Sequence, residues 1–82
     1  MVLNASLVGS QVVVEAGAAG LLTIQTAAQN NTLGASEFNA GGGISAAVSV
    51  TADGDLVFND AFATTAVATM LSNHGDVVFN GT

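Results

Sequence analysis

The chain contains no lysine, arginine or cysteine in its 82 residues, and this absence limits how its fold can be stabilised. Without cysteine there are no disulfides, and zinc sites built from thiolates are excluded with them. His74 is the only cationic side chain available for an intramolecular salt bridge. A domain this small commonly depends on oligomerisation when such links are missing. We therefore expect one structural domain, residues 1–82, that associates with other chains.

The charged side chains are six carboxylates, which give a net charge of −6 at pH 7. Recognition of nucleic acids, anionic membranes and phosphate groups by side chains relies on Lys and Arg. These three classes of partner are therefore excluded. The partners that we expect are copies of the same chain and, alternatively, a larger coat or shell protein with a neutral or basic surface.

The first residues, 1–5, carry no basic side chain and do not resemble a secretory signal. The longest apolar stretch, residues 12–24, is interrupted by Glu15 and by two glycines, and it is shorter than the roughly 20 residues that span a bilayer. We expect a protein that is made in the cytoplasm, does not enter a membrane, and works in a virion or an extracellular assembly.

Five short segments are rich in β-branched and large apolar residues and are bracketed by glycine, asparagine and aspartate: 11–14, 21–26, 44–51, 56–58 and 77–79. Within the third segment, Val48 and Val50 share one face, while Ser49 and Thr51 share the other. A period of two with one polar face is typical of an antiparallel sheet. The sequence thus predicts a mainly β, single-domain antiparallel sheet or sandwich.

A pattern Gly-x-x-x-Phe-Asn occurs three times, at residues 34–39, 54–59 and 75–80, with spacings of 20 and 21 residues. A period near 20 is that of one rung of a β-solenoid. The alternative fold is therefore a short β-solenoid with rungs of about 20 residues. Glycine and asparagine also bracket many short buried strands, so chance matches in a low-complexity chain explain the pattern as well.

One segment has helical rather than β periodicity. Its larger apolar residues fall at 62, 66, 67, 70 and 71, and Asn59 or Asp60 can cap its first turn. We expect one short helix near residues 61–72, although its three threonines lower helix propensity. Residues 27–39 are polar and rich in Gly and Asn, which predicts a loop or an arm.

The largest apolar side chains supply the candidate core: Phe38, Phe58, Phe62, Phe79, Val57, Val78, Met70 and Leu71. Contacts between subunits are expected from residues 12–14 and from the arm at 27–39. Four phenylalanines are the only aromatic residues, and the remaining apolar side chains are mostly Ala and Val, which bury little area each. A core of this kind again favours association.

Catalytic chemistry has few candidates in this chain. His74 and Asp76 lie two positions apart, but no serine stands in a Gly-x-Ser-x-Gly turn, and Lys, Cys and Tyr are absent. His74 is better explained as a turn or helix-terminus residue. We predict that the protein is not an enzyme and has no catalytic residues or cofactor.

Three carboxylates, Asp53, Asp55 and Asp60, are the candidates for a calcium site, because Ca²⁺ prefers oxygen ligands. Their spacing does not satisfy the EF-hand loop, and Asp-Gly-Asp is also typical of a solvated hairpin turn. The glycine run 41–43 lacks the lysine of a phosphate-binding loop. A hinge or a close backbone contact explains this run better.

The remaining signal is a surface with little charge. Exposed β edges in natural proteins are commonly protected by charged residues, lysine above all, and here that protection is nearly absent. The sequence therefore favours a non-catalytic structural subunit of a self-assembling particle or filament, such as a virion coat or decoration protein or an extracellular fibre subunit. The alternative is a small β-rich adhesin-like module that presents Asn, Thr and Asp to a glycan.

Overall fold

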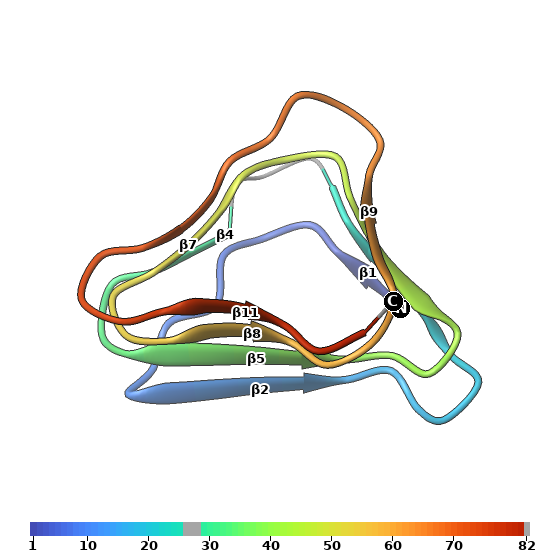
Figure 1. The fold of residues 1–82 in the computed structure, drawn as a ribbon, viewed down its shortest axis with the longest axis horizontal. Helices are drawn as coiled ribbons and strands as arrows, with labels where there is room; N and C mark the ends of the chain where they lie inside the picture. Colours follow the sequence, from blue (N-terminus) through green and yellow to red (C-terminus); the bar gives the residue numbers. More distant parts are fainter. Residues whose placement is uncertain (26–28, 82) are drawn as a thin grey trace.

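A computed structural model describes residues 1–25 and 29–81, and in that part of the chain it contains strands and turns but no helix. The chain winds into a short solenoid of triangular cross-section, in which successive turns lie over one another (Figure 1). Every strand pairing described is parallel. The mainly β prediction is confirmed, the antiparallel sheet is wrong, and the alternative β-solenoid is the fold that fits.

Each side of the triangle is one parallel sheet. The first face contains β1 (Val2–Leu3), β3 (Leu21–Ile24), β6 (Gly43–Ala46) and β9 (Phe62–Thr64). The second face contains β4 (Gln29–Asn31), β7 (Val50–Ala52) and β10 (Met70–Ser72). The third face contains β2 (Gln11–Glu15), β5 (Ala35–Asn39), β8 (Leu56–Phe58) and β11 (Val77–Phe79). In chain order, rung 1 holds β1 and β2, and rungs 2, 3 and 4 hold β3–β5, β6–β8 and β9–β11.

The Gly-x-x-x-Phe-Asn pattern marks equivalent positions of three rungs. Phe38 pairs with Phe58, and Phe58 pairs with Phe79, across the third face. Period-2 alternation could not separate this fold from an antiparallel sandwich, because both have one inward and one outward side per sheet. The run 44–51, expected as one strand, is divided between β6 and β7 by a bend that carries the chain from the first face to the second.

The solenoid interior holds the core, and a stack of aromatic rings runs along it. The rings of Phe38 and Phe58 are 5.2 Å apart at 15°, and those of Phe58 and Phe79 are 5.3 Å apart at 10°. Phe62 tilts against Phe58 at 4.4 Å. The fully or almost fully buried apolar residues are Val14, Leu22, Ile24, Phe38, Ala40, Ile44, Ala46, Val50, Ala52, Leu56 and Phe58.

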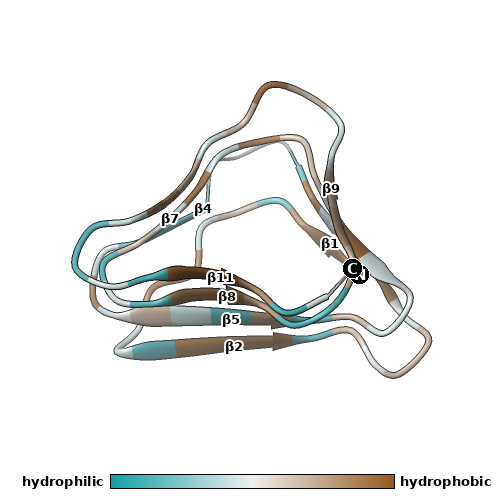
Figure 2. Ribbon diagram, viewed as in Figure 1, coloured by the Kyte–Doolittle hydropathy of each residue, from teal (hydrophilic) through white to brown (hydrophobic). Residues whose placement is uncertain are grey.

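The predicted core was correct in part. Phe38 and Phe58 are buried, and Phe62 and Met70 pack against the core while partly exposed. Val57 and Val78 alternate with inward residues and so belong to the outer side of the third face, where Figure 2 shows β8 and β11 apolar along their length. Leu71 is 46% exposed, so its assignment to the core was wrong. Phe79 stacks on the buried Phe58 but is 50% exposed, so its assignment was correct only in part.

The expected helix at 61–72 is wrong. The segment forms β9 and β10, joined by a turn, and these strands pair with β6 and β7 of the preceding rung. Val67, one of the residues that suggested an apolar stripe, is fully exposed. Pairing with strands already in place and the low helix propensity of its threonines both favour the extended form.

The expected loop at 27–39 is also wrong where it can be judged. Residues 27 and 28 lie outside the described part, and the rest of the segment contains β4 and β5. Its polar character has a structural cause, because Gln29 and Asn31 are buried and bind the backbone of rung 1. Gln29 and Asn31 are therefore interior residues, while Asn30 between them is exposed.

Glycines occupy the corners where consecutive rungs come closest. Gly17 and Gly43 have positive φ angles of 97° and 116°, which side chains rarely adopt. The N–H of Gly42 donates to the carbonyl oxygen of Gly20 at 2.8 Å. A Cβ on Gly42 would lie 2.7 Å from that same oxygen. The glycine run 41–43 is therefore a close backbone contact, as one of the two explanations predicted.

Candidate functional site: the asparagine column and the ends of the solenoid

Three asparagines, the last residue of each repeat, form a column along one corner of the third face. The side chain of Asn59 donates from Nδ2 to Oδ1 of Asn39 at 2.7 Å. Asn80 donates in the same way to Asn59 at 2.8 Å. We call Asn39, Asn59 and Asn80 the asparagine column. Every donor in it points toward the N-terminal rung, so the column has a direction.

Glu15 stands at the N-terminal end of this column. It pairs in register with Asn39, and its Oε1 accepts a hydrogen bond from Asn39 Nδ2 at 2.6 Å. Glu37 on β5 accepts the second hydrogen of the same amide at 2.9 Å. The column therefore begins at a carboxylate and ends at Oδ1 of Asn80, to which no group in the described residues donates.

The C-terminal rung leaves interior surface uncovered. One side of the Phe79 ring lies against Phe58, while half of the residue remains exposed. Met70 and Val77 are also partly exposed, although they face the core. Among the described residues, no capping element covers β9, β10 and β11.

The backbone of β11 is ready to pair with a further strand. The carbonyl of Asp76 accepts from Leu56 N at 2.8 Å, so the N–H of Val77, on the opposite side of the same planar peptide, points to the free edge. Asn80 N donates to Phe58 O at 2.8 Å, which directs the carbonyl of Phe79 to that edge as well. These groups form the unpaired edge of a parallel sheet.

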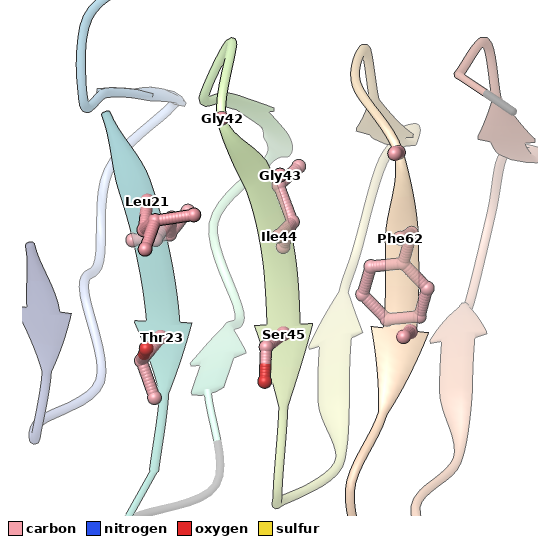
Figure 3. Close-up of a pocket in the computed structure, with 10 residues that line it drawn as sticks. Leu21, Thr23, Gly42, Gly43, Ile44, Ser45 and Phe62 are labelled. Carbon is pink, nitrogen blue, oxygen red and sulfur yellow. The ribbon is translucent and has the colours of Figure 1, made fainter. Parts of the chain in front are cut away.

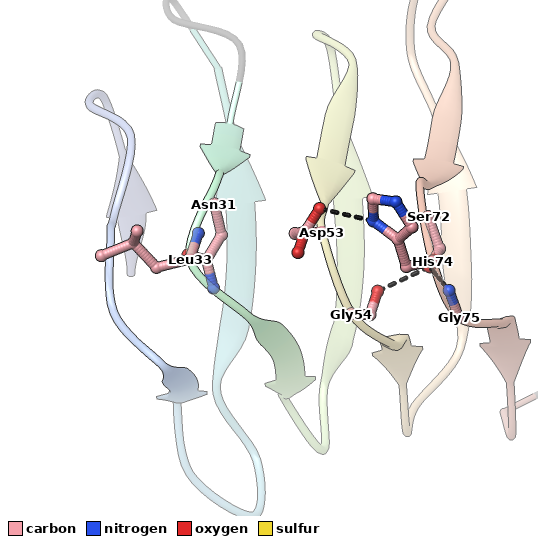
Figure 4. A network of polar contacts seen from close by, with 7 residues as sticks. All are labelled: Asn31, Leu33, Asp53, Gly54, Ser72, His74 and Gly75. Carbon is pink, nitrogen blue, oxygen red and sulfur yellow. Dashed lines mark hydrogen bonds and ion pairs between the residues drawn. The ribbon is translucent and has the colours of Figure 1, made fainter.

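The N-terminal rung is better covered. Segment 4–10 takes the place of a strand on the second face, and the buried side chains of Gln29 and Asn31 hold it. Gln29 accepts from Leu7 N at 3.2 Å, and Asn31 accepts from Gly9 N at 3.2 Å. Figure 4 shows Asn31 directed into this corner beside Leu33. Val14, in rung 1, is accordingly only 5% exposed.

The candidate catalytic residues do not form a triad. His74 Nδ1 lies 2.8 Å from Oδ1 of Asp53, in the turn below, and the histidine side chain is 77% exposed (Figure 4). The nearby hydroxyl of Ser72 donates to the carbonyl of Gly54 and accepts from Gly75 N. His74 occupies a turn, as one of its two explanations predicted, and the pair joins two rungs.

The candidate calcium ligands are engaged separately. Asp53 contacts His74, Asp55 Oδ1 accepts from Asp76 N at 3.0 Å, and Asp60 Oδ2 accepts from Ala40 N at 2.6 Å. No group of three His, Asp or Glu side chains in the described residues is arranged to hold a metal ion. Asp60 and Glu15 do line a common hollow of about 420 Å³ at the corner after β2 and β8.

A second hollow of about 460 Å³ lies on the outer side of the first face. Gly43 leaves its floor without a side chain, and Leu21, Thr23 and Ser45 surround it (Figure 3). Ile44 and Phe62, which pair with each other in register, also line the hollow. The hollow is wide open and mostly apolar, and it holds no titratable group.

Comparison with protein-family models, curated proteins and solved structures finds no match for this chain. Among the described residues, no helix is long and apolar enough to cross a membrane. Function is therefore inferred from the chain's own geometry.

Proposed function

We propose that this chain is a non-catalytic structural subunit that assembles with copies of itself through the ends of its solenoid. The observation that supports the proposal is the C-terminal rung, where Phe79 is half exposed beside an unpaired parallel edge. Burial of apolar surface and pairing of free N–H and C=O groups both favour a further rung on this end. Solenoid rungs supply such a partner directly, because one copy offers the same strand geometry as the next.

The settings in which such a subunit works are those that the composition favours, a virion coat or decoration layer and an extracellular fibre. The glycan-binding alternative has weaker support. The amide groups of Asn39 and Asn59 are bonded to one another and to carboxylates, so they are not free to bind a sugar.

Sedimentation and light scattering test the proposal over a range of protein and salt concentrations, from neutral to mildly acidic pH. Wild-type protein should form species larger than its 8.0 kDa monomer. Salt should promote them, because copies with a net charge of −6 repel one another and salt screens that repulsion.

The variant Val77→Pro is designed to prevent a further strand from pairing with β11. It removes the N–H that faces the free edge and leaves intact the bonds that Asp76 and Asn80 make to rung 3. The variant should remain monomeric, while Val77→Ala, which keeps the N–H, should assemble. A wild-type protein that stays at 8.0 kDa in every condition would overturn the proposal.

A further inference from the structure

We propose that the solenoids stack head to tail and that ionised Glu15 blocks the junction, so that assembly requires a proton on this side chain. The inference rests on the proposed function and specifies its direction and its control. The new contact is Asn80 of one copy against Glu15 of the next. Both residues belong to the same corner of the third face, one at each end of the solenoid.

Continuing the observed register gives the head-to-tail pairing. Within the chain, Val14 pairs with Phe38, Phe38 with Phe58, and Phe58 with Phe79. A further rung placed on β11 in the same register brings Val14 of the next copy onto the exposed side of Phe79. On the first face, the pairings likewise run from Val2 to Thr23, Ser45 and Ala63, so that Val2 of the next copy follows Ala63.

Most contacts in this junction are compatible. On the third face, the inward residues Val77 and Phe79 meet the inward residues Val12 and Val14 of the next copy. Thr64 and Ser72 bring hydroxyl groups to inward positions of rung 4, because they pair with the buried Ala46 and Ala52. Just before β11, the same register places Asp76 opposite Gln11 of the next copy, whose amide can donate to the carboxylate. On the second face, β10 meets segment 4–10 in place of a strand.

The asparagine column is the exception. Its donors point toward the N-terminus, so the next residue in the column must donate a hydrogen to Oδ1 of Asn80. Glu15 of the next copy occupies that position. An ionised carboxylate has acceptors and no donor, so oxygen would face oxygen at the junction. A protonated carboxyl, or an amide, can donate and continue the column.

The junction is small enough for one such contact to matter. The end of the solenoid is a triangle, and half of 30 Å × 22 Å gives a projected area of about 330 Å² (Figure 1). Stable interfaces bury roughly 800 Å² of accessible surface per partner. Accessible surface exceeds projected area, but a junction of one rung on one rung remains a small interface. A mismatched polar contact at its corner, where the equivalent bond between Asn59 and Asn39 is part-buried, then weakens it further.

Other charges surround Glu15 and must be separated from its own effect. Glu37 on β5 shares the Asn39 amide with it, and Asp60 lines the same corner hollow. From the neighbouring copy, the column presents the uncharged Asn80. Acidification neutralises all the carboxylates together, and the isoelectric point is about 4.1, so low pH alone lowers general repulsion.

The decisive comparison is therefore made at neutral pH with Glu15→Gln and Glu37→Gln, which remove one charge each from the same cluster. In Glu15→Gln, the introduced amide still accepts from Asn39 and also offers a donor to Asn80 of the preceding copy. We expect Glu15→Gln to assemble at a protein concentration about tenfold lower than wild type at about pH 7.5. Glu37→Gln should stay close to wild type, and circular dichroism should show the same fold in all three.

Each remaining outcome is informative. Equal promotion by the two variants would attribute the effect to net charge and overturn the role of Glu15. Equal assembly of all three proteins at neutral pH would overturn the proton requirement while leaving the proposed function in place. Absence of assembly by Glu15→Gln and wild type at both neutral and acidic pH would overturn the proposed function itself. Combining Glu15→Gln with Val77→Pro should restore the monomer.

Discussion

The ring of Phe79 stacks on that of Phe58, with centroids 5.3 Å apart and planes at 10°, yet the two residues differ completely in burial. Phe58 is fully enclosed between rungs 2 and 4, whereas the outer side of Phe79 meets no further rung in the described chain. The same position of the repeat therefore serves as core in one rung and as an exposed surface in the next.

This difference predicts unequal costs of truncation. Phe58→Ala should lower the free energy of unfolding by about 3–5 kcal/mol, the range for removal of a buried aromatic ring. Phe79→Ala should cost roughly 1–2 kcal/mol, because half of its surface is already hydrated. Urea denaturation of dilute monomeric protein measures both values. Equal costs would show that Phe79 is buried in the monomer.

Two glycines of rungs 1 and 2 predict a second contrast. A Cβ on Gly34 would collide with the carbonyl group of Ser10 in the rung below, whereas a Cβ on Gly9 would find its nearest atom at 3.6 Å. Gly34→Ala should destabilise the protein by about 2 kcal/mol or more, and Gly9→Ala by less than about 1 kcal/mol. Thermal unfolding measures the stability of both variants. A Gly34→Ala variant as stable as wild type would contradict the close contact between Gly34 and Ser10.

The direction of the asparagine column predicts pH-dependent stability in Asn59→Asp. The introduced carboxyl faces the acceptor Oδ1 of Asn39, so the folded state favours its protonated form. Folding thus raises the pKa of this carboxyl. The folded variant therefore keeps its stability at low pH and loses stability as the pH rises. At neutral pH the variant should be about 1–3 kcal/mol less stable than wild type.

Asn59→Ala is the control for this prediction, because it removes the donor and introduces no carboxyl group. Its stability relative to wild type should change little between neutral and mildly acidic pH. If Asn59→Asp and Asn59→Ala show the same dependence on pH in parallel urea titrations, the column does not have the polarity described.

Calcium should not stabilise the monomer. Asp53, Asp55 and Asp60 each bind a different partner, in turns on different parts of the solenoid. We expect the Tm to be unchanged by millimolar Ca²⁺ and by a chelator. A rise of several degrees with Ca²⁺ that the chelator reverses would show that these carboxylates, or others, form a site.

The strands that the sequence predicted are those with continuous apolar or β-branched residues, such as 11–14, 56–58 and 77–79. Those it missed, β4 and β5, are stabilised by a tertiary effect, since Gln29 and Asn31 of β4 are buried where rung 1 supplies their backbone partners. The segment 61–72 was misassigned because its helical spacing is local information, while its strands depend on β6 and β7.

Part of the candidate site could be predicted from the sequence. The repeated asparagine was visible in the Gly-x-x-x-Phe-Asn pattern, and stacking of rungs is what aligns such residues. Glu15 was not visible, because it lies 24 residues before Asn39 while the later spacings in the column are 20 and 21. Its role in the column follows from register, which the sequence did not reveal.

The most direct measurement of the central claim is a cross-link between the two ends of the column. The chain has no cysteine, so Glu15→Cys and Asn80→Cys proteins each carry a single thiol. Head-to-tail stacking places these positions opposite each other on adjacent parallel strands, close enough for a disulfide. Oxidation of an equimolar mixture should give the mixed dimer, and replacing Glu15→Cys by Gln11→Cys should abolish it. Homodimers of Asn80→Cys alone, or no dimer in any mixture, would contradict head-to-tail assembly.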